Sequence, residues 1–379
     1  MEQSDSKKMY VFLMVLTIAS ALSLQTWMTL FNNFAVERVG LDGQHVGTIQ
    51  SIREIPGFLS LLAIFVMLII KEHRLSALSI LFLGGGVALT GFFPSFYGLI
   101  ITTLIMSFGF HYFETTNQSL TLQYFDQTTS PRVFGRLRSL ASGANIFVGG
   151  AIFGLAYILE YREIYLIFGG IAFMAGLWAF GQNPTSKDVP LQKKKMILKR
   201  EYGLYYFLTF MAGARRQIFM AFAVFLMVQH FGYAIKEVTL LFMLNNLINY
   251  FLAPFIGKSI VRFGERKVLS VEYGSLILVF IAYATTQSKA VVGVLYVLDH
   301  IFFNCSIAIR TYFQKIGDPQ DIAPTMAVGF TINHIAAVVI PVLGGLMWMI
   351  DYRIPFFAGA AMSLVSLAAV QKIKTGQNP

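Results

Sequence analysis

The sequence predicts an all-α membrane protein with twelve transmembrane helices arranged as two pseudo-symmetric six-helix bundles. Of its 379 residues, 56% are hydrophobic and only 13% are charged, whereas soluble domains carry about 25% charged residues. Uncharged stretches of about 20 residues, the length that a helix needs to cross a bilayer, recur along the whole chain. A single cysteine, Cys305, excludes a disulfide framework and a multi-cysteine metal site.

Apolar runs, read against turn and charge signals, define the individual spans. We expect helices at 9–34, 44–70, 75–93, 96–122, 139–159, 163–181, 203–230, 237–257, 268–287, 290–314, 323–350 and 354–371. The third and fourth are separated at Phe92-Phe93-Pro94-Ser95, because the uncharged run there is too long for one crossing.

The basic residues support this count. Of the 29 Lys and Arg residues, 20 fall on one side of the predicted membrane and 4 within spans, and the remaining 5 are Arg38, Arg162, Lys236, Lys289 and Arg353 on the other side. Because basic loops stay in the cytoplasm, both termini and the connection at 182–202 are expected there. The compact loops favour a multi-pass protein of a bacterial inner (cytoplasmic) membrane.

The polar, basic segment 182–202 divides the chain into bundles at 1–181 and 203–379. An offset of about 190 residues aligns Gln25 with Gln217, His111 with Asp299, and Glu160-Tyr161-Arg162 with Asp351-Tyr352-Arg353. Parallel six-helix repeats of this kind are typical of transporters that hold their substrate between the repeats.

The loop after the eighth predicted span, from Gly257 to Lys267, resembles the G-x-x-x-D-R-x-G-R-R signature of the major facilitator superfamily. The resemblance implies alternating access and a gating role for Gly257, Arg262, Gly264 and Arg266. Val261 replaces the acidic residue of the signature, and the equivalent first-half loop, 71–75, lacks its glycines. The run Gly149-Gly150-x-x-x-Gly154 is similar to the glycine-rich motif of antiporters in this family but lacks its proline. Arg310, near the cytoplasmic end of its span, either joins the gate or reaches the interface with its long side chain.

Ionisable side chains inside the spans are the functional candidates, since each costs at least about 2.5–3.5 kcal/mol to insert. The inventory is four arginines (Arg53, Arg215, Arg216 and Arg310), three carboxylates (Glu54, Glu114 and Asp299) and three histidines (His111, His300 and His334). Each has a structural alternative, such as an interhelical ion pair.

The positive balance suits an anionic substrate, which arginine binds through its planar fork. We expect proton-coupled transport of a small organic anion by a monomer. The expected substrate-binding residues are Arg53, Arg215, Arg216, Gln25, Gln217, Asn333 and His334. The expected proton-coupling residues are Asp299, Glu114, His111 and Glu54.

Two alternatives stay open. The Phe-rich and Met-rich walls would also suit proton-driven efflux of an amphipathic drug or metabolite. A non-transporting membrane receptor on the same fold is the other alternative. An enzyme, a nucleic-acid partner, a cofactor and a metal are not expected, and ATP-driven pumping has no Walker A sequence to support it.

Overall fold

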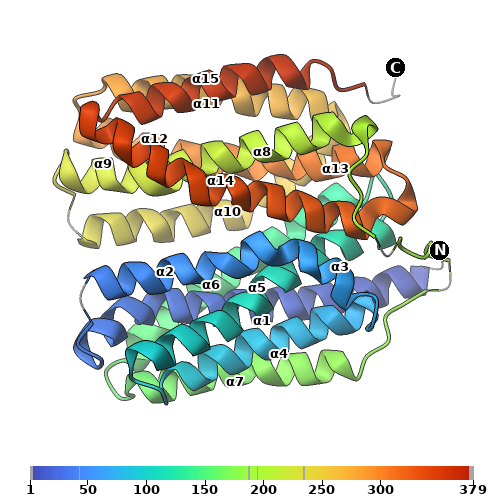
Figure 1. The fold of residues 1–379 in the computed structure, drawn as a ribbon, viewed down its shortest axis with the longest axis horizontal. Coiled ribbons are helices and arrows are strands. Elements are labelled where there is room, and N and C mark those ends of the chain that lie inside the picture. The colour runs from blue at the N-terminus through green and yellow to red at the C-terminus, as the bar shows by residue number, and fades with distance from the viewer. Residues whose placement is uncertain (1–2, 42, 187, 194, 234, 375–379) are drawn as a thin grey trace. The chain divides into compact units, whose positions relative to one another are not determined.

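The computed structural model of the chain describes residues 3–41, 43–186, 188–193, 195–233 and 235–374. Three basic positions used for the predicted topology, Lys187, Lys194 and the side chain of Lys236, lie outside the described residues. The described residues form helices and contain no strand, which confirms the predicted all-α fold class (Figure 1).

The first half of the chain supplies six helical segments. They are α1 (Gln3–Glu37), a second segment made of α2 (Gly43–Phe58), η1 (Leu59–Leu62) and α3 (Ala63–Val66), then α4 (Glu72–Thr90), α5 (Phe96–Tyr124), α6 (Ser130–Leu155) and α7 (Tyr161–Phe180).

The second half supplies six more. They are η2 (Arg200–Tyr202) with α8 (Gly203–Ile218), η3 (Phe219–Ala223) and α9 (Val224–Gln229), then α10 (Ile235–Phe263), α11 (Glu265–Thr285), α12 (Lys289–Phe303) with η4 (Asn304–Ser306) and α13 (Ile307–Ile316), η5 (Pro319–Asp321) with α14 (Ile322–Ile350), and α15 (Ile354–Val370).

Twelve segments therefore match the twelve predicted spans, and within the described residues nine helices are long and apolar enough to cross a membrane by length and composition alone. The structure adds irregularities that hydropathy does not reveal. The second segment contains Pro56, which cannot donate a backbone hydrogen bond to the preceding turn, and it passes into a 3₁₀-helix at Leu59–Leu62. The seventh segment contains a π-helical stretch at 219–223.

The chain forms two compact units. The first unit comprises residues 1–126, 140–197 and 319–331, and the second comprises 127–139, 198–318 and 332–379. Two continuous helices, α6 and α14, therefore each contribute one part to each unit.

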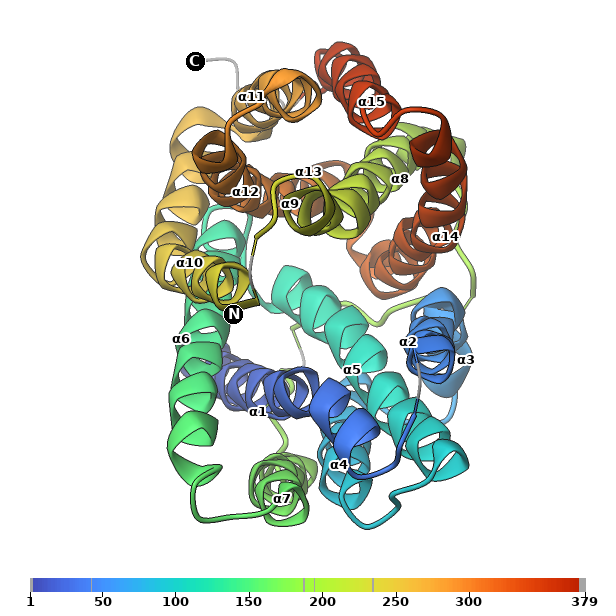
Figure 2. The same ribbon diagram turned by 90° about the vertical axis from the view of Figure 1, so that its left-hand side faces the viewer.

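In the first unit, α4 lies beside both α5 and α7 (Figure 2). Glycine makes this close approach possible. A Cβ atom on Gly169 of α7 would lie 2.3 Å from the backbone nitrogen of Ala88, and one on Gly109 of α5 would lie 2.4 Å from that of Leu83. Small residues at such contacts let helix backbones approach closely without a hydrophobic driving force between helices.

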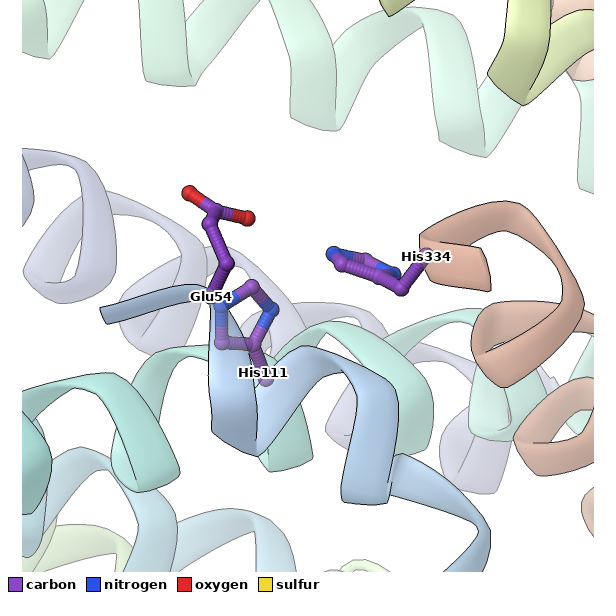
Figure 3. Close-up of side chains that lie close together, drawn as sticks. All are labelled: Glu54, His111 and His334. Carbon is purple, nitrogen blue, oxygen red and sulfur yellow. The ribbon is translucent and has the colours of Figure 1, made fainter. Parts of the chain in front are cut away.

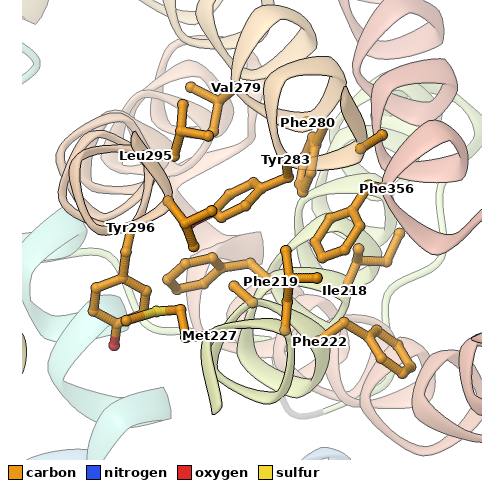
Figure 4. Close-up of a cluster of buried hydrophobic side chains, with 14 of the residues drawn as sticks. Ile218, Phe219, Phe222, Met227, Val279, Phe280, Tyr283, Leu295, Tyr296 and Phe356 are labelled. Atoms are coloured by element: carbon orange, nitrogen blue, oxygen red, sulfur yellow. The ribbon is translucent and has the colours of Figure 1, made fainter. Parts of the chain in front are cut away.

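In the second unit, a cluster of buried aromatic and aliphatic side chains joins α8, η3, α9, α11, α12 and α15 (Figure 4). Phe219 stacks on Tyr296 with ring centroids 5.2 Å apart, and Tyr283 stacks on Phe356 at the same separation. The cluster residues Ile218 and Tyr296 lie one helical turn from Arg215 of α8 and Asp299 of α12.

Candidate functional site

Three fully buried ionisable side chains lie in the interior of the second unit. Arg215 of α8, Glu272 of α11 and Asp299 of α12 are each 0% exposed. An Nη2 atom of Arg215 lies 3.9 Å from Oε1 of Glu272. Asp299 interacts electrostatically with both of them. We call these three residues the buried triad.

Arg215 is held in place by two further contacts. Its guanidinium lies over the ring of Tyr273, 4.3 Å from the centroid. Its Nη1 donates a hydrogen bond to Oγ of Ser366 on α15, and Ser366 in turn donates to the carbonyl of Met362 at 2.7 Å. The arginine therefore connects α8, α11 and α15 around the triad.

The triad is not saturated with hydrogen bonds. Within the described part of the chain, no hydrogen-bond partner satisfies the carboxylate oxygens of Glu272 or Asp299, or Nε and Nη2 of Arg215. One fixed positive charge faces two carboxyl groups. A buried charge without compensation is costly, so the triad reaches neutrality when it holds one proton or another single positive charge.

Sequence reasoning placed Arg215 and Asp299 inside the membrane but missed Glu272. The residue lies within the predicted span 268–287, and a carboxylate inside a predicted span is itself a sign of a functional residue that the sequence showed. The correct inventory of carboxylates inside the spans therefore includes Glu272 with Glu54, Glu114 and Asp299.

The first unit contains a second, more open polar cluster. An Nη2 atom of Arg53 lies 2.7 Å from Oε1 of Glu54, and their side chains are 23% and 32% exposed. The Arg53 guanidinium also lies 5.5 Å from the ring centroid of the buried Trp27. A carboxylate oxygen of Glu54 and a ring nitrogen of His111 lie within 4.8 Å of each other (Figure 3). Glu114, one turn further along α5, is half-buried.

The other predicted binding residues are spread over both units. Gln25 donates a hydrogen bond to the hydroxyl of Thr29, four residues further along α1, at 3.1 Å. Arg216 and Gln217, which follow Arg215 in the sequence, are half-buried. Asn333 donates to the carbonyl of Thr209 at 3.3 Å, and His334 is buried.

The predicted gating residues lie at one end of the second unit. Gly257 of α10 permits a close approach to the start of α6, because a Cβ there would lie 2.3 Å from the carbonyl oxygen of Pro131. Gly264 has a φ of +79° and joins α10 to α11. Arg266 donates from Nε to Gln371 at 3.1 Å.

The two remaining arginines of this group make aromatic contacts. The exposed Arg262 lies over Phe263, and the half-buried Arg310 lies over Phe134 of α6. Next to them, Lys315 forms an ion pair of 2.8 Å with the fully buried Glu265, which sequence reasoning did not foresee.

The connection between the halves also makes specific contacts that the sequence did not predict. Gln192 donates to the carbonyl of Pro319 at 2.8 Å and accepts from the backbone nitrogen of Ala323 at 2.9 Å. Lys193 forms a 2.8 Å ion pair with the buried Asp321, and its backbone nitrogen donates to Gln320. We call this contact the linker clamp; it ties residues 192–193 to the beginning of α14 within the first unit.

Comparison with known proteins supports the architecture. The family model of the Major Facilitator Superfamily matches residues 11–339. Multidrug resistance protein 1 of Bacillus subtilis (strain 168) is 23% identical over 257 residues, which are 63% of this chain. The match spans 64% of the length of that relative.

Solved structures of similar fold cover nearly the whole chain. FucP, a fucose:proton symporter of E. coli, matches with a TM-score of 0.75 and 14% identity over 97% of this chain and 98% of its own. The human organic anion transporter MFSD10 (TETRAN) matches with a TM-score of 0.71 and 11% identity over 97% of this chain and 99% of its own. At these identities the likeness concerns the fold alone.

Proposed function

The chain belongs to the major facilitator superfamily, and we propose that it couples the movement of a small organic anion to the movement of protons. It is a multi-pass membrane protein of that family of transporters. It is a secondary transporter by family. In the proposed cycle, one six-helix bundle, 1–181, moves against the other, 203–379, so that the substrate site is open to each side in turn.

The main support for proton coupling is the charge balance of the buried triad. Two carboxyl groups and one guanidinium, all 0% exposed, need one extra positive charge to be neutral. A proton is the smallest cation, so it can supply this positive charge without enlarging the site. When a conformational change admits water to Asp299 or Glu272, ionisation of that carboxyl group becomes less costly and the proton can leave.

For the anion itself, we assign the direct contact to Arg53 and Arg216. Both guanidiniums lie within predicted spans and neither side chain is fully buried. Arg215 is sealed between Glu272, Tyr273 and Ser366, so its proposed role is to set the charge of the triad. The partly exposed Glu54 and the nearby His111 form a second proton-accepting pair in the first unit.

The proposal is tested with purified protein in liposomes. Uptake of a labelled organic anion is expected to respond to an imposed pH gradient. Asp299→Asn and Glu272→Gln should each permit anion exchange while reducing the response to the gradient. Arg53→Gln and Arg216→Gln should instead raise KM, because they remove charge-assisted hydrogen bonds to the anion.

A matched control is Gly170→Ala in α7, at a position where a Cβ atom would meet no other atom within 4 Å. It should transport as the unaltered protein does. Undiminished gradient-driven uptake in both carboxylate variants would refute the coupling assignment, and an unchanged KM in both arginine variants would refute the anion assignment.

Efflux of an amphipathic drug is the second candidate, favoured by the similarity to Multidrug resistance protein 1. Under this reading, Glu54 or Glu114 would bind a lipophilic cation. Expression in a drug-sensitive host would then raise resistance to such cations, and Glu54→Gln would abolish that resistance. Anion transport without resistance would exclude it.

The orientation is part of the proposal. The split of 20 basic residues against 5 supports cytoplasmic termini and linker in a bacterial inner membrane. A reporter that fluoresces only in the cytoplasm, fused before Lys7 or after Lys374, should fluoresce in both fusions, and the purified chain should sediment as a monomer.

A further inference from the structure

A cavity that includes no residue of the buried triad and neither Arg53 nor Glu54 lies at one end of the second unit. Its volume is about 590 Å³, and it is lined by Gln229, His230, Trp348, Asp351, Tyr352 and Arg353. This is within the size range of small-ligand sites. Helix α9 ends at Gln229 and α14 ends at Ile350, so the cavity lies beside two helix ends, which the predicted spans place at the membrane boundary. Tryptophan and tyrosine concentrate at that boundary.

Aromatic rings build one wall of the cavity. The rings of His230 and Tyr352 pack with centroids 4.6 Å apart, and Trp348 lies 6.0 Å from Tyr352. Trp348 is stacked on Phe222 of the buried aromatic cluster, with an interplanar angle of 19°. Because Phe222 is itself 5% exposed, this wall is anchored to the core of the unit.

Hydrogen bonds orient the polar groups around that wall. Trp348 donates from Nε1 to Oε1 of Gln229 at 3.2 Å, which directs the Gln229 amide. Arg353 donates from Nε to the Tyr352 hydroxyl at 3.4 Å, and its backbone nitrogen donates to Oδ1 of Asp351 at 2.9 Å. The Tyr352 contact raises the pKa of Arg353 further above an ordinary value that already keeps the guanidinium charged.

These bonds leave donors for a ligand. Over the described ranges, no hydrogen bond occupies the Nη groups of Arg353 or the amide nitrogen of Gln229. Two donors of this kind, one of them a charged fork, match the oxygens of a phosphate group. The second carboxylate oxygen of Asp351 and the neighbouring aromatic faces match an ammonium group.

The repeat-related tripeptide of the first unit shows that this arrangement is specific to the second. There, Glu160 forms an ion pair with Arg38, and the Tyr161 hydroxyl donates to Glu37 at 2.6 Å. Arg162 lies 4.2 Å from the ring centroid of Phe92. In the first unit, the repeat-related Glu160 and Tyr161 are thus bound by Arg38 and Glu37. In the second unit, the equivalent Asp351 and Tyr352 line the cavity.

The surroundings of the cavity identify the class of ligand. The last turn of α14 carries Leu346, Met349 and Ile350, which are 64%, 84% and 80% exposed. Apolar side chains that are this exposed at the end of a predicted span favour contact with acyl chains. We propose that the cavity binds the headgroup of a phospholipid, with its phosphate on Arg353 and Gln229, an ethanolamine ammonium on Asp351, and its acyl chains along Met349 and Ile350. This site is independent of the transported substrate.

The test measures lipid binding to the delipidated full-length protein in detergent, by native mass spectrometry. Short-chain phosphatidylethanolamine should bind, and diacylglycerol with the same chains should not. Arg353→Gln should weaken binding at least about tenfold, because it removes a charge-assisted contact. Arg353→Lys keeps the charge without the planar fork and should weaken binding by a smaller factor; it also serves if the glutamine variant folds poorly.

Arg162→Gln, at the repeat-related position, is the matched control and should bind lipid as the unaltered protein does. The proposal is overturned if diacylglycerol binds equally well, or if Arg353→Gln and Arg162→Gln behave alike. Equal binding of soluble phosphoethanolamine would also overturn it, because the acyl contacts on α14 would then contribute nothing.

Discussion

Neutralising the two carboxylates of the buried triad should produce a strongly non-additive loss of stability. In Glu272→Gln or Asp299→Asn, the remaining carboxylate still balances the charge of Arg215, and we expect a cost of about 1 kcal/mol each, the size of an ordinary substitution. In the double variant, the fully buried guanidinium keeps no compensating charge.

The magnitude follows from the geometry. With Nη2 of Arg215 3.9 Å from Oε1 of Glu272, the attraction is about 4 kcal/mol at an effective dielectric constant of about 20. This agrees with the roughly 3–5 kcal/mol that removing one partner from a buried ion pair costs. The double variant should therefore lose about 1–3 kcal/mol more than the sum of the single variants.

Reversible unfolding of the purified protein in detergent measures these differences. Adding Arg215→Met to the double variant removes the uncompensated charge and should recover most of the lost stability. Additive losses in the double variant, or failure of Arg215→Met to restore it, would refute the charge-balance account of the triad.

Two further predictions concern other contacts. Lys193→Met in the linker clamp removes the ion pair with the buried Asp321. We expect the free energy of unfolding to fall by about 2 kcal/mol and trypsin to cleave the linker faster. Lys195→Met, at an exposed position, should change neither. Gly257→Ala places a Cβ atom 2.3 Å from a backbone oxygen and should lower the melting temperature, by an amount corresponding to about 1–3 kcal/mol. Gly149→Ala meets no neighbouring atom and should be neutral or stabilising; equal losses in the two glycine variants would contradict the packing seen in the second unit.

Much of this architecture could be predicted from local sequence patterns. Helix length, apolar runs and the distribution of basic residues act over about 20 neighbouring residues, and they predicted all twelve segments. Breaks inside segments were missed. The 3₁₀-helix at Asn304–Ser306 interrupts the tenth span without a proline or glycine to mark it. Asn304 donates a 2.6 Å hydrogen bond to Asn249 of α10, a contact with another helix that no local pattern contains.

The candidate site was predictable only in part. That Arg215 and Asp299 lie in the membrane follows from hydropathy, but their partners do not. Glu272 is 57 positions after Arg215 and Ser366 is 151 positions after it, and no periodicity links residues on different helices.

What the sequence determined by itself is the set of helices, their expected orientation and the presence of charges that a bilayer tolerates poorly. Only the tertiary structure decided which charges share one interior, that Gln192 and Lys193 bind the start of α14, and that Arg353 lines a cavity whereas Arg162 lies against Phe92. The physical reason is that transfer into a bilayer depends on each segment separately, whereas pairing depends on the faces that helices present when they pack.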